Sequence, residues 1–193
     1  MAFIAKNCYY FEKPGPENTE DAARFAIERA QELGISTVVV ASSSGKSAKV
    51  FFDAMKGSGL FLVVVTHFSP SGECEFSAVT EQELRNQGVR IMTGTLALSG
   101  LERALSRSPR VGGGSRTEAI AEALRRIVGS GFKVAVECVL IAADQGAIGI
   151  ENEVVAVAGT RSGADTVCVI RPAHTASFFD LQVREIVAMP RVR

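Results

Sequence analysis

Hydrophobic and polar positions along the chain alternate between two patterns, the spacing of an amphipathic helix and the short apolar run of a buried strand. Residues 19–33 carry apolar side chains at helical spacing after the breaker EKPGPEN and a capping Asn18, and this pattern stops at Gly34. The β-branched run STVVVAS follows with few polar breaks, which is typical of a strand covered on both faces. A helix followed by a buried strand indicates the beginning of an α/β alternation.

The alternation continues through the middle of the chain. The predicted elements are a helix at 46–57, a strand at 60–67, a helix that opens with Thr80-x-x-Glu83 and ends at Gly88, a strand at 89–94, and two helices that open with Ser99-x-x-Glu102 and Ser115-x-x-Glu118 on either side of the glycine-rich segment 109–114. Strands separated by helices predict a mostly parallel sheet with helices on both faces.

The last third of the chain contains one ambiguous apolar run. FKVAVECVLIAAD, at 132–144, fits a strand or a buried helix, and its length and alanine-rich end favour the helix. EVVAVAG, DTVCVI and VREIVAM then predict three strands, the first two joined by a link short enough for an antiparallel pair. We therefore expect one domain over 1–193, an α/β/α sandwich of three layers whose mostly parallel sheet has antiparallel strands at its C-terminal end.

Composition narrows the classes of function. The 193 residues include 21 basic and 21 acidic ones without a block of like charge, so we expect no nucleic-acid partner. The four cysteines form no CxxC pair and there are two histidines, so we expect no metal site and a reducing, cytoplasmic setting. No apolar run approaches the ~20 residues of a membrane span, and no membrane partner is expected. The sequence leaves a homo-oligomer open.

The tripeptide Gly45-Lys46-Ser47 follows a buried strand and resembles the end of a nucleotide-binding P-loop. A P-loop also needs a glycine five positions before Gly45, where this chain has Val40 within the apolar strand. The loop is therefore too short to wrap a polyphosphate. An NTPase is the third-ranked interpretation. Such a protein needs an acidic residue at the end of a buried strand, and Asp144 after VLIAA fits this only in sequence, because the segment is interpreted as a helix.

A more general anion site fits this turn better. A strand leads into a serine-rich turn and then a helix, whose free N–H groups and dipole favour a phosphate. The predicted phosphate-binding residues are Ser42, Ser43, Ser44, Gly45, Lys46 and Ser47. The alternative is that the serines only cap the helix, which serine does often.

Two segments carry a family resemblance. SSSGKSA resembles the T-x-S-G-x-S-A loop of the pyruvate kinase carboxy-terminal domain, which holds a sugar-phosphate effector. VVAVAGTRSGADTVCVI, at 154–170, resembles the closing strand, loop and strand of that domain, with 162–166 in place of its Ser-Gly-Thr-Thr-Asn-type turn. The chain has no room for the catalytic barrel, so the resemblance does not imply pyruvate kinase activity.

Over nearly its whole length the chain resembles small stand-alone proteins of this fold from archaea and bacteria. That resemblance implies flavin mononucleotide (FMN) as a ligand. The resulting hypothesis is a protein that binds a phosphorylated small molecule, FMN first. Its main rival is a regulatory module that senses a sugar phosphate. No set of residues specifies an enzymatic reaction.

Ligands of open parallel sheets lie beyond the carboxyl ends of the strands. Besides the serine-rich turn, the predicted ligand-binding residues are Thr66, His67, Gly94, Thr95, Gly159, Thr160, Arg161, Ser162, Gly163, Ala164 and Asp165. The alternative for glycine and threonine is turn formation. His67 is as well explained as a structural imidazole. Asp165, in a Gly-flanked loop, is expected to be solvated and available to ligand hydroxyls.

Glu137 lies within the apolar run at 132–144. Its carboxylate would contact a ligand, face solvent or form an ion pair, and a buried position would raise its pKa. Phe68, Phe178 and Phe179 could pack on a flat ring, although core packing explains most phenylalanines. Glu137 completes the set of predicted ligand-binding residues.

Overall fold

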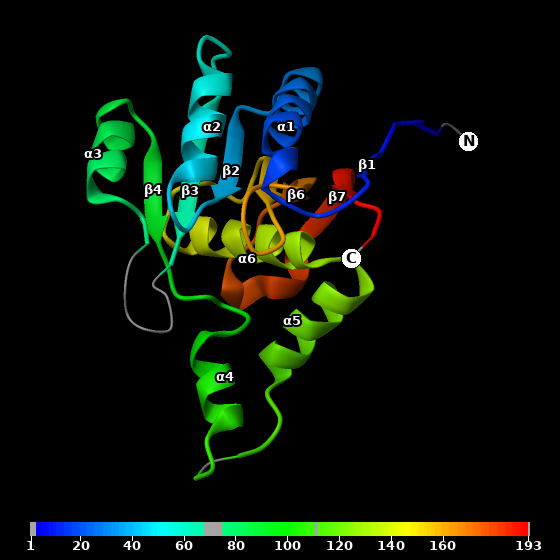
Figure 1. Ribbon diagram of the computed structural model, residues 1–193. Helices are drawn as coiled ribbons and strands as arrows, with labels where there is room; N and C mark the ends of the chain where they lie inside the picture. Colours follow the sequence, from blue (N-terminus) through cyan, green and yellow to red (C-terminus); the bar gives the residue numbers. More distant parts are fainter. Residues whose placement is uncertain (1–2, 68–74, 111, 193) are drawn as a thin grey trace.

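A computed structural model describes residues 3–67, 75–110 and 112–192, so Phe68 lies outside the described residues. Its elements are β1 (Tyr9–Phe11), η1 (Pro16–Asn18), α1 (Thr19–Leu33), β2 (Thr37–Ala41), α2 (Lys46–Met55), β3 (Phe61–Thr66), α3 (Ala78–Asn86), β4 (Arg90–Thr93), α4 (Gly100–Arg107), α5 (Arg116–Ile127), α6 (Ser130–Asp144), β5 (Val154–Ala158), β6 (Thr166–Arg171), η2 (Thr175–Asp180) and β7 (Gln182–Pro190). Figure 1 shows helices on both faces of one sheet.

The described strands form one sheet in the order β1-β7-β6-β5-β2-β3-β4. β5, β2, β3 and β4 are parallel to one another, whereas β6 runs antiparallel to both β5 and β7. This confirms the mostly parallel sheet with antiparallel pairing near the C-terminal end. Because β2 lies between β5 and β3, its backbone is paired on both edges and its valines are buried on both faces.

Two apolar cores flank the sheet. Val38 and Val40 of β2 face the core under α1, α2 and α3, while Val39 faces the core under α6. Successive strand side chains point to opposite faces, which explains why a central strand needs an unbroken apolar run. α6 is buried around nearly its whole surface, so the helical interpretation of 132–144 is confirmed. The three-layer α/β/α architecture is likewise as expected.

Several local expectations need correction. α3 begins one residue after Ser77, whose side chain accepts a hydrogen bond from the Thr80 amide, so the Thr80-x-x-Glu83 box lies inside the helix. Asn18 does not cap α1 with its side chain and instead donates to the Lys13 carbonyl. β1 was not predicted. The Ser115 cap is confirmed, with its hydroxyl oxygen 3.0 Å from the Glu118 amide.

The helices α4 and α5 form a hairpin that projects from the body below the lower ends of β2 and β3 in Figure 1. α5 packs on α6, whereas α4 contains no buried residue. No helix within the described ranges is long and apolar enough to cross a membrane.

Candidate functional site

The carboxyl ends of the parallel strands lie side by side at one edge of the sheet, hereafter the carboxyl edge. Val40 of β2 pairs with Val64 of β3 and with Val157 of β5. Because adjacent strands lie about 5 Å apart, the segments that follow β3, β2 and β5 leave the sheet next to one another. The structure therefore brings together three of the predicted strand ends.

The turn at 42–47, hereafter the serine turn, connects β2 to α2. The Ser42 amide donates to the Val65 carbonyl at 3.0 Å, and the Ser42 hydroxyl oxygen accepts from the Ala48 amide at 3.3 Å. Ser42 therefore caps α2, as the alternative interpretation proposed. The Thr66 hydroxyl lies 3.5 Å from the Ser43 carbonyl, so Thr66 supports the turn from β3.

Gly45 fixes the shape of the serine turn. Its φ of 85° lies in the left-handed region, and an added Cβ would lie 2.9 Å from the Phe76 ring. Glycine is required here on both counts. Because α2 begins at Lys46, the turn is too short to wrap a triphosphate. Asp144 ends helix α6 rather than a strand, so the acidic residue of a P-loop site is also missing from its expected place.

The serine turn presents several unused donors. The amides of Gly45, Lys46 and Ser47 have no acceptor among the described residues. Such amides at the start of a helix carry partial positive charge and suit an anion. Ser43 and Ser44 are half-buried and Lys46 is exposed, whereas Ser47 is buried. The turn therefore presents three such amides together with two accessible hydroxyls and a lysine.

Asp165 lies in the second loop at this edge, residues 159–165, and departs from expectation. Its side chain is fully buried rather than solvated. One carboxylate oxygen accepts from the Thr160 amide at 2.9 Å and the other from the Thr166 hydroxyl at 2.8 Å. A buried carboxylate with both oxygens engaged braces the loop. The prediction of an available, solvated Asp165 is therefore wrong.

The middle of this second loop is fixed by α1. The Ala164 amide donates to the Thr19 hydroxyl oxygen at 3.1 Å, and a Cβ on Gly163 would overlap Pro16. A Cβ on Gly159 would likewise overlap the Gly163 carbonyl oxygen. The side chains left accessible are the exposed Arg161 and Ser162 and the half-buried Thr160.

Glu137 forms an ion pair with Lys133, one helical turn away on α6, and both side chains are buried. The same carboxylate accepts from the Leu98 amide at 2.8 Å and from the Ser99 hydroxyl at 3.3 Å. Burial lowers the pKa of Lys133, although Glu137 acts to raise it. Of the alternatives for Glu137 the ion pair is confirmed, and its carboxylate holds the segment before α4.

The remaining predicted residues divide between packing and exposure. The Gly94 amide donates to the Thr66 carbonyl, and a Cβ on Gly94 would overlap Ile141. Thr95 is exposed and His67 is half-buried. Phe178 packs on the core under α6 and Phe179 is exposed. Both belong to η2, which follows the end of β6 that lies away from the carboxyl edge.

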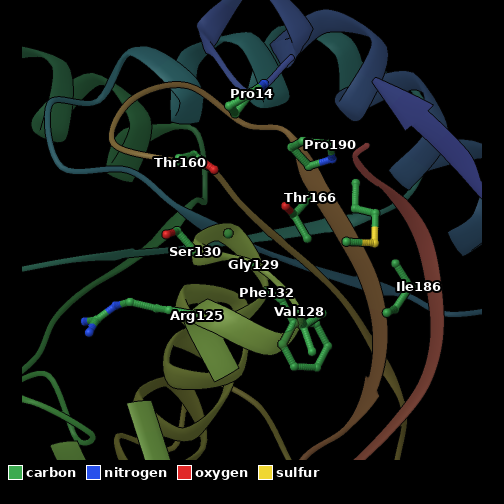
Figure 2. A pocket seen from close by; sticks show the side chains of 12 residues that line it. Pro14, Arg125, Val128, Gly129, Ser130, Phe132, Thr160, Thr166, Ile186 and Pro190 are labelled. Carbon is green, nitrogen blue, oxygen red and sulfur yellow. The ribbon is translucent and has the colours of Figure 1, made fainter. Parts of the chain in front are cut away.

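A small cavity at the start of α6 was not predicted. It has a volume of about 60 Å³ and is lined by Pro14, Arg125, Val128, Gly129, Ser130, Gly131, Phe132, Thr160, Thr166, Ile186, Met189 and Pro190. Figure 2 shows the Ser130 and Thr160 hydroxyls on its polar side, Phe132 and Ile186 on its apolar side, and the Arg125 guanidinium extending outward. The feature of the sequence that could have indicated this cavity is the motif Gly-Ser-Gly at 129–131, directly before the apolar run.

Gly131 allows α6 to approach this loop closely. A Cβ there would overlap the Thr166 hydroxyl and lie 2.8 Å from the Asp165 carboxylate. The start of α6 therefore lies against a buried carboxylate, where its dipole stabilises negative charge. Among the described residues, no group of three His, Cys, Asp or Glu could hold a metal ion.

Taken together, these features define a three-layer α/β domain with backbone amide donors exposed at the carboxyl edge. The model of the family described as pyruvate kinase, alpha/beta domain, matches residues 20–170. The chain belongs to this family.

Two solved structures show how the chain relates to whole enzymes. A pyruvate kinase from Cryptosporidium parvum is 15% identical with a TM-score of 0.42, over 80% of this chain and 23% of that one. A structure of Cryptosporidium parvum pyruvate kinase in complex with ADP is 14% identical with a TM-score of 0.36, over 88% and 23%. The chain spans less than a quarter of either enzyme.

Proposed function

We propose that the protein binds a phosphorylated small molecule at the carboxyl edge, with the phosphate on the serine turn. The observation that carries this proposal is that the amides of Gly45, Lys46 and Ser47, at the start of α2, have no acceptor within the described ranges. Amides at a helix start bind phosphate because the groups converge and the dipole favours negative charge.

The second loop supplies further polar contacts. Thr160, Arg161 and Ser162 follow β5, the strand next to β2, and their side chains are at least partly accessible. Arg161 is a cation that can pair bidentately with a second phosphate or a carboxylate. A ligand with two anionic groups separated by a polar body, such as a sugar bisphosphate, is consistent with these donors.

FMN is proposed as a ligand on the resemblance. Its phosphate matches the donors of the serine turn. The cavity beside α6 has a volume of about 60 Å³. Pockets that hold small-molecule ligands and cofactors are roughly 300–1,000 Å³, so this cavity is too small for the three-ring isoalloxazine of FMN. We therefore derive no redox step for this protein. A regulatory role that senses a sugar phosphate is the alternative, and the two-loop arrangement favours it.

A cytoplasmic location is proposed on the state of the cysteines. Cys8, Cys138 and Cys168 are free thiols, and burial raises the pKa of Cys138 and of Cys168 to about 12. The two buried thiols are therefore unreactive, and free cysteines are typical of a reducing compartment.

Native mass spectrometry of freshly purified protein tests the proposal. A bound species with the mass of FMN, together with a yellow preparation, supports FMN, whereas a colourless protein whose Tm rises with sugar bisphosphate supports the sensor. Magnesium-dependent ATP turnover would support the third-ranked NTPase. Absence of binding to every phosphorylated probe would refute the proposal. The same spectrum reports whether the protein is a homo-oligomer.

A further inference from the structure

The two outer strands of the sheet, β4 and β1, differ in how their free backbone groups are used. β4 pairs with β3 alone, and in the register of this pair Ile91 and Thr93 turn their backbone groups away from β3. The Ile91 carbonyl accepts from the Arg85 guanidinium at 2.8 Å. The Thr93 carbonyl accepts from the Gln145 side-chain amide at 3.3 Å. Side chains therefore occupy the outward carbonyls of this edge, which hinders pairing with a further strand.

The opposite edge of the sheet, formed by β1, is open. β1 pairs only with β7, and the Arg191 amide donates to the Phe11 carbonyl at 2.8 Å. Because successive residues turn their backbone groups to opposite sides, those of Tyr9 and Phe11 face β7, whereas the N–H and C=O of Tyr10 face away from the sheet. Neither of these two groups has a partner among the described residues. A strand edge of this kind is free to pair with another strand.

Apolar side chains are exposed beside this open edge. The segment at 3–8, hereafter the N-terminal arm, extends away from the body (Figure 1), and its Phe3 and Ile4 are 89% and 86% exposed. On β1 itself Tyr10 is exposed, and Tyr9 stacks on Phe25 of α1 with ring centroids 4.0 Å apart. Apolar side chains gathered at an open strand are typical of an interaction surface.

We infer that β1 pairs antiparallel with β1 of a second copy of this chain, so that two sheets join across a two-fold axis. Such an axis presents the same strand from both copies, so each copy supplies the donor and the acceptor that the other's open edge needs. The N-terminal arms then lie along the joined edges, and their apolar side chains lose contact with water. The inference does not depend on the proposed function, because no ligand takes part.

The sequence around β1 favours one register of this pairing. With Tyr9 opposite Tyr9 of the second copy, Cys8 comes opposite Tyr10, and the outward backbone groups of both residues form hydrogen-bonded pairs. The same register places Lys6 opposite Glu12 on both sides of the axis, and opposite charges across an antiparallel pair stabilise it. A register with Tyr10 opposite itself would place Glu12 opposite Cys8 and leave Lys6 without a carboxylate.

Both charges of this cross-strand pair are available to a second copy. Glu12 and Lys6 are exposed. Lys6 contacts Glu32 of its own chain at 3.4 Å, but both side chains of that pair are largely in solvent. An exposed ion pair of this kind contributes little to stability, so it does not hold Lys6 away from a partner.

Sedimentation velocity over a dilution series tests the dimer with two variants of one residue. Tyr10→Pro removes the N–H that faces the second copy. That N–H makes no bond within the monomer, and proline is tolerated on an edge strand in this position, so each copy should still fold. The control Tyr10→Val removes the same side chain and keeps the N–H. We expect the wild type and Tyr10→Val to dimerise, and Tyr10→Pro to do so at least ~10-fold more weakly. A wild type that stays monomeric throughout, or equal dimerisation of the two variants, would overturn the inference.

A disulfide between copies tests the axis directly. Opposite residues of a non-hydrogen-bonded antiparallel pair have Cα atoms about 4.5 Å apart, within the roughly 4.4–6.8 Å that a disulfide spans. In a background with Cys8→Ser and Cys74→Ser, Tyr9→Cys should therefore form a covalent dimer under mild oxidation. The control is Phe61→Cys, since Phe61 is also exposed but begins the inner strand β3. No covalent dimer through residue 9, or equal rates for both variants, would contradict the pairing.

Charge exchange tests the register. Glu12→Lys places two lysines opposite each other in the proposed pair and should weaken the dimer severalfold. Adding Lys6→Glu restores opposite charges and should recover the affinity of the wild type. The control is Glu20→Lys, which makes the same change of charge in the first turn of α1 and should leave dimerisation unchanged. If Glu12→Lys has no effect, or if the double variant recovers nothing, the register is wrong.

Discussion

Lys133 and Glu137 form an ion pair within α6 that is removed from solvent on all sides. The carboxylate of Glu137 also receives the Leu98 amide, so the pair joins the central helix to the base of the α4–α5 hairpin. Removing one charge leaves the other buried and unpaired, which is more damaging than removing both.

Lys133→Met should therefore destabilise the fold by about 3–5 kcal/mol, while the double variant Lys133→Met with Glu137→Leu should recover much of that loss. Urea unfolding followed by circular dichroism measures both. Lys49→Met serves as the control, because Lys49 pairs with Asp53 at the surface and its loss should change stability by less than about 1 kcal/mol. A double variant that is no more stable than Lys133→Met would contradict the account.

Gly131 provides a test of close packing at the start of α6. Gly131→Ala would push a methyl group into the Thr166 hydroxyl and towards Asp165, and should cost about 1–3 kcal/mol through overpacking. Gly114→Ala is the control, since its Cβ would meet nothing within 4 Å. The two midpoints of urea unfolding give the comparison, and equal midpoints would show that the contact is not tight.

Asp144 makes stability depend on pH. Burial alone would raise the pKa of Asp144, but hydrogen bonds from the Thr175 hydroxyl and amide and from His174 lower it below its ordinary value. A carboxyl with a lowered pKa stabilises the fold above its unfolded pKa of about 3.9 and loses this contribution as the pH falls below that value.

The prediction for Asp144→Ala is a flatter dependence of Tm on pH between about pH 5 and the acid limit than the wild type shows. The side chain is more than one-third exposed, so the effect should stay below about 1 kcal/mol. Thermal unfolding at a series of pH values gives the two curves, and parallel curves would show that Asp144 does not titrate in this way.

Much of the fold could be predicted from the sequence because its central strands are buried on both faces. Val38, Val39 and Val40 must all be apolar in a sheet covered by helices, which makes the run easy to recognise. β1 was missed because its three residues pair only with β7, and Tyr9 and Tyr10 stay exposed. A short edge strand has no apolar pattern of its own.

The site was harder to predict because hydrogen bonds across the fold decide which polar groups are free. The sequence predicts a solvated Asp165 because Gly163 is close by, but its carboxylate is buried and accepts hydrogen bonds from the Thr160 amide and the Thr166 hydroxyl. Ser42 looks like a ligand donor, yet its side chain is buried and its hydroxyl oxygen accepts from the Ala48 amide. The strand ends could be located from the sequence, whereas the partners of each side chain depend on the tertiary structure.

The central claim is that the serine turn binds phosphate, and titration calorimetry of Ser44→Asp tests it most directly. Ser44 is half-buried at the turn, so a carboxylate there would repel an incoming phosphate, whereas Ser47 is buried and a charge would also disturb folding. The control Ser115→Asp adds the same charge at the start of α5. FMN and a sugar bisphosphate are titrated into each protein, with riboflavin as the ligand that lacks phosphate.

The account predicts that at least one phosphorylated ligand binds the wild type and Ser115→Asp alike, and binds Ser44→Asp at least ~10-fold more weakly, equivalent to about 1.4 kcal/mol. If the ligand is FMN, riboflavin should bind all three proteins with the same weak affinity. Equal affinity of the phosphorylated ligand for Ser44→Asp and the wild type would contradict the claim.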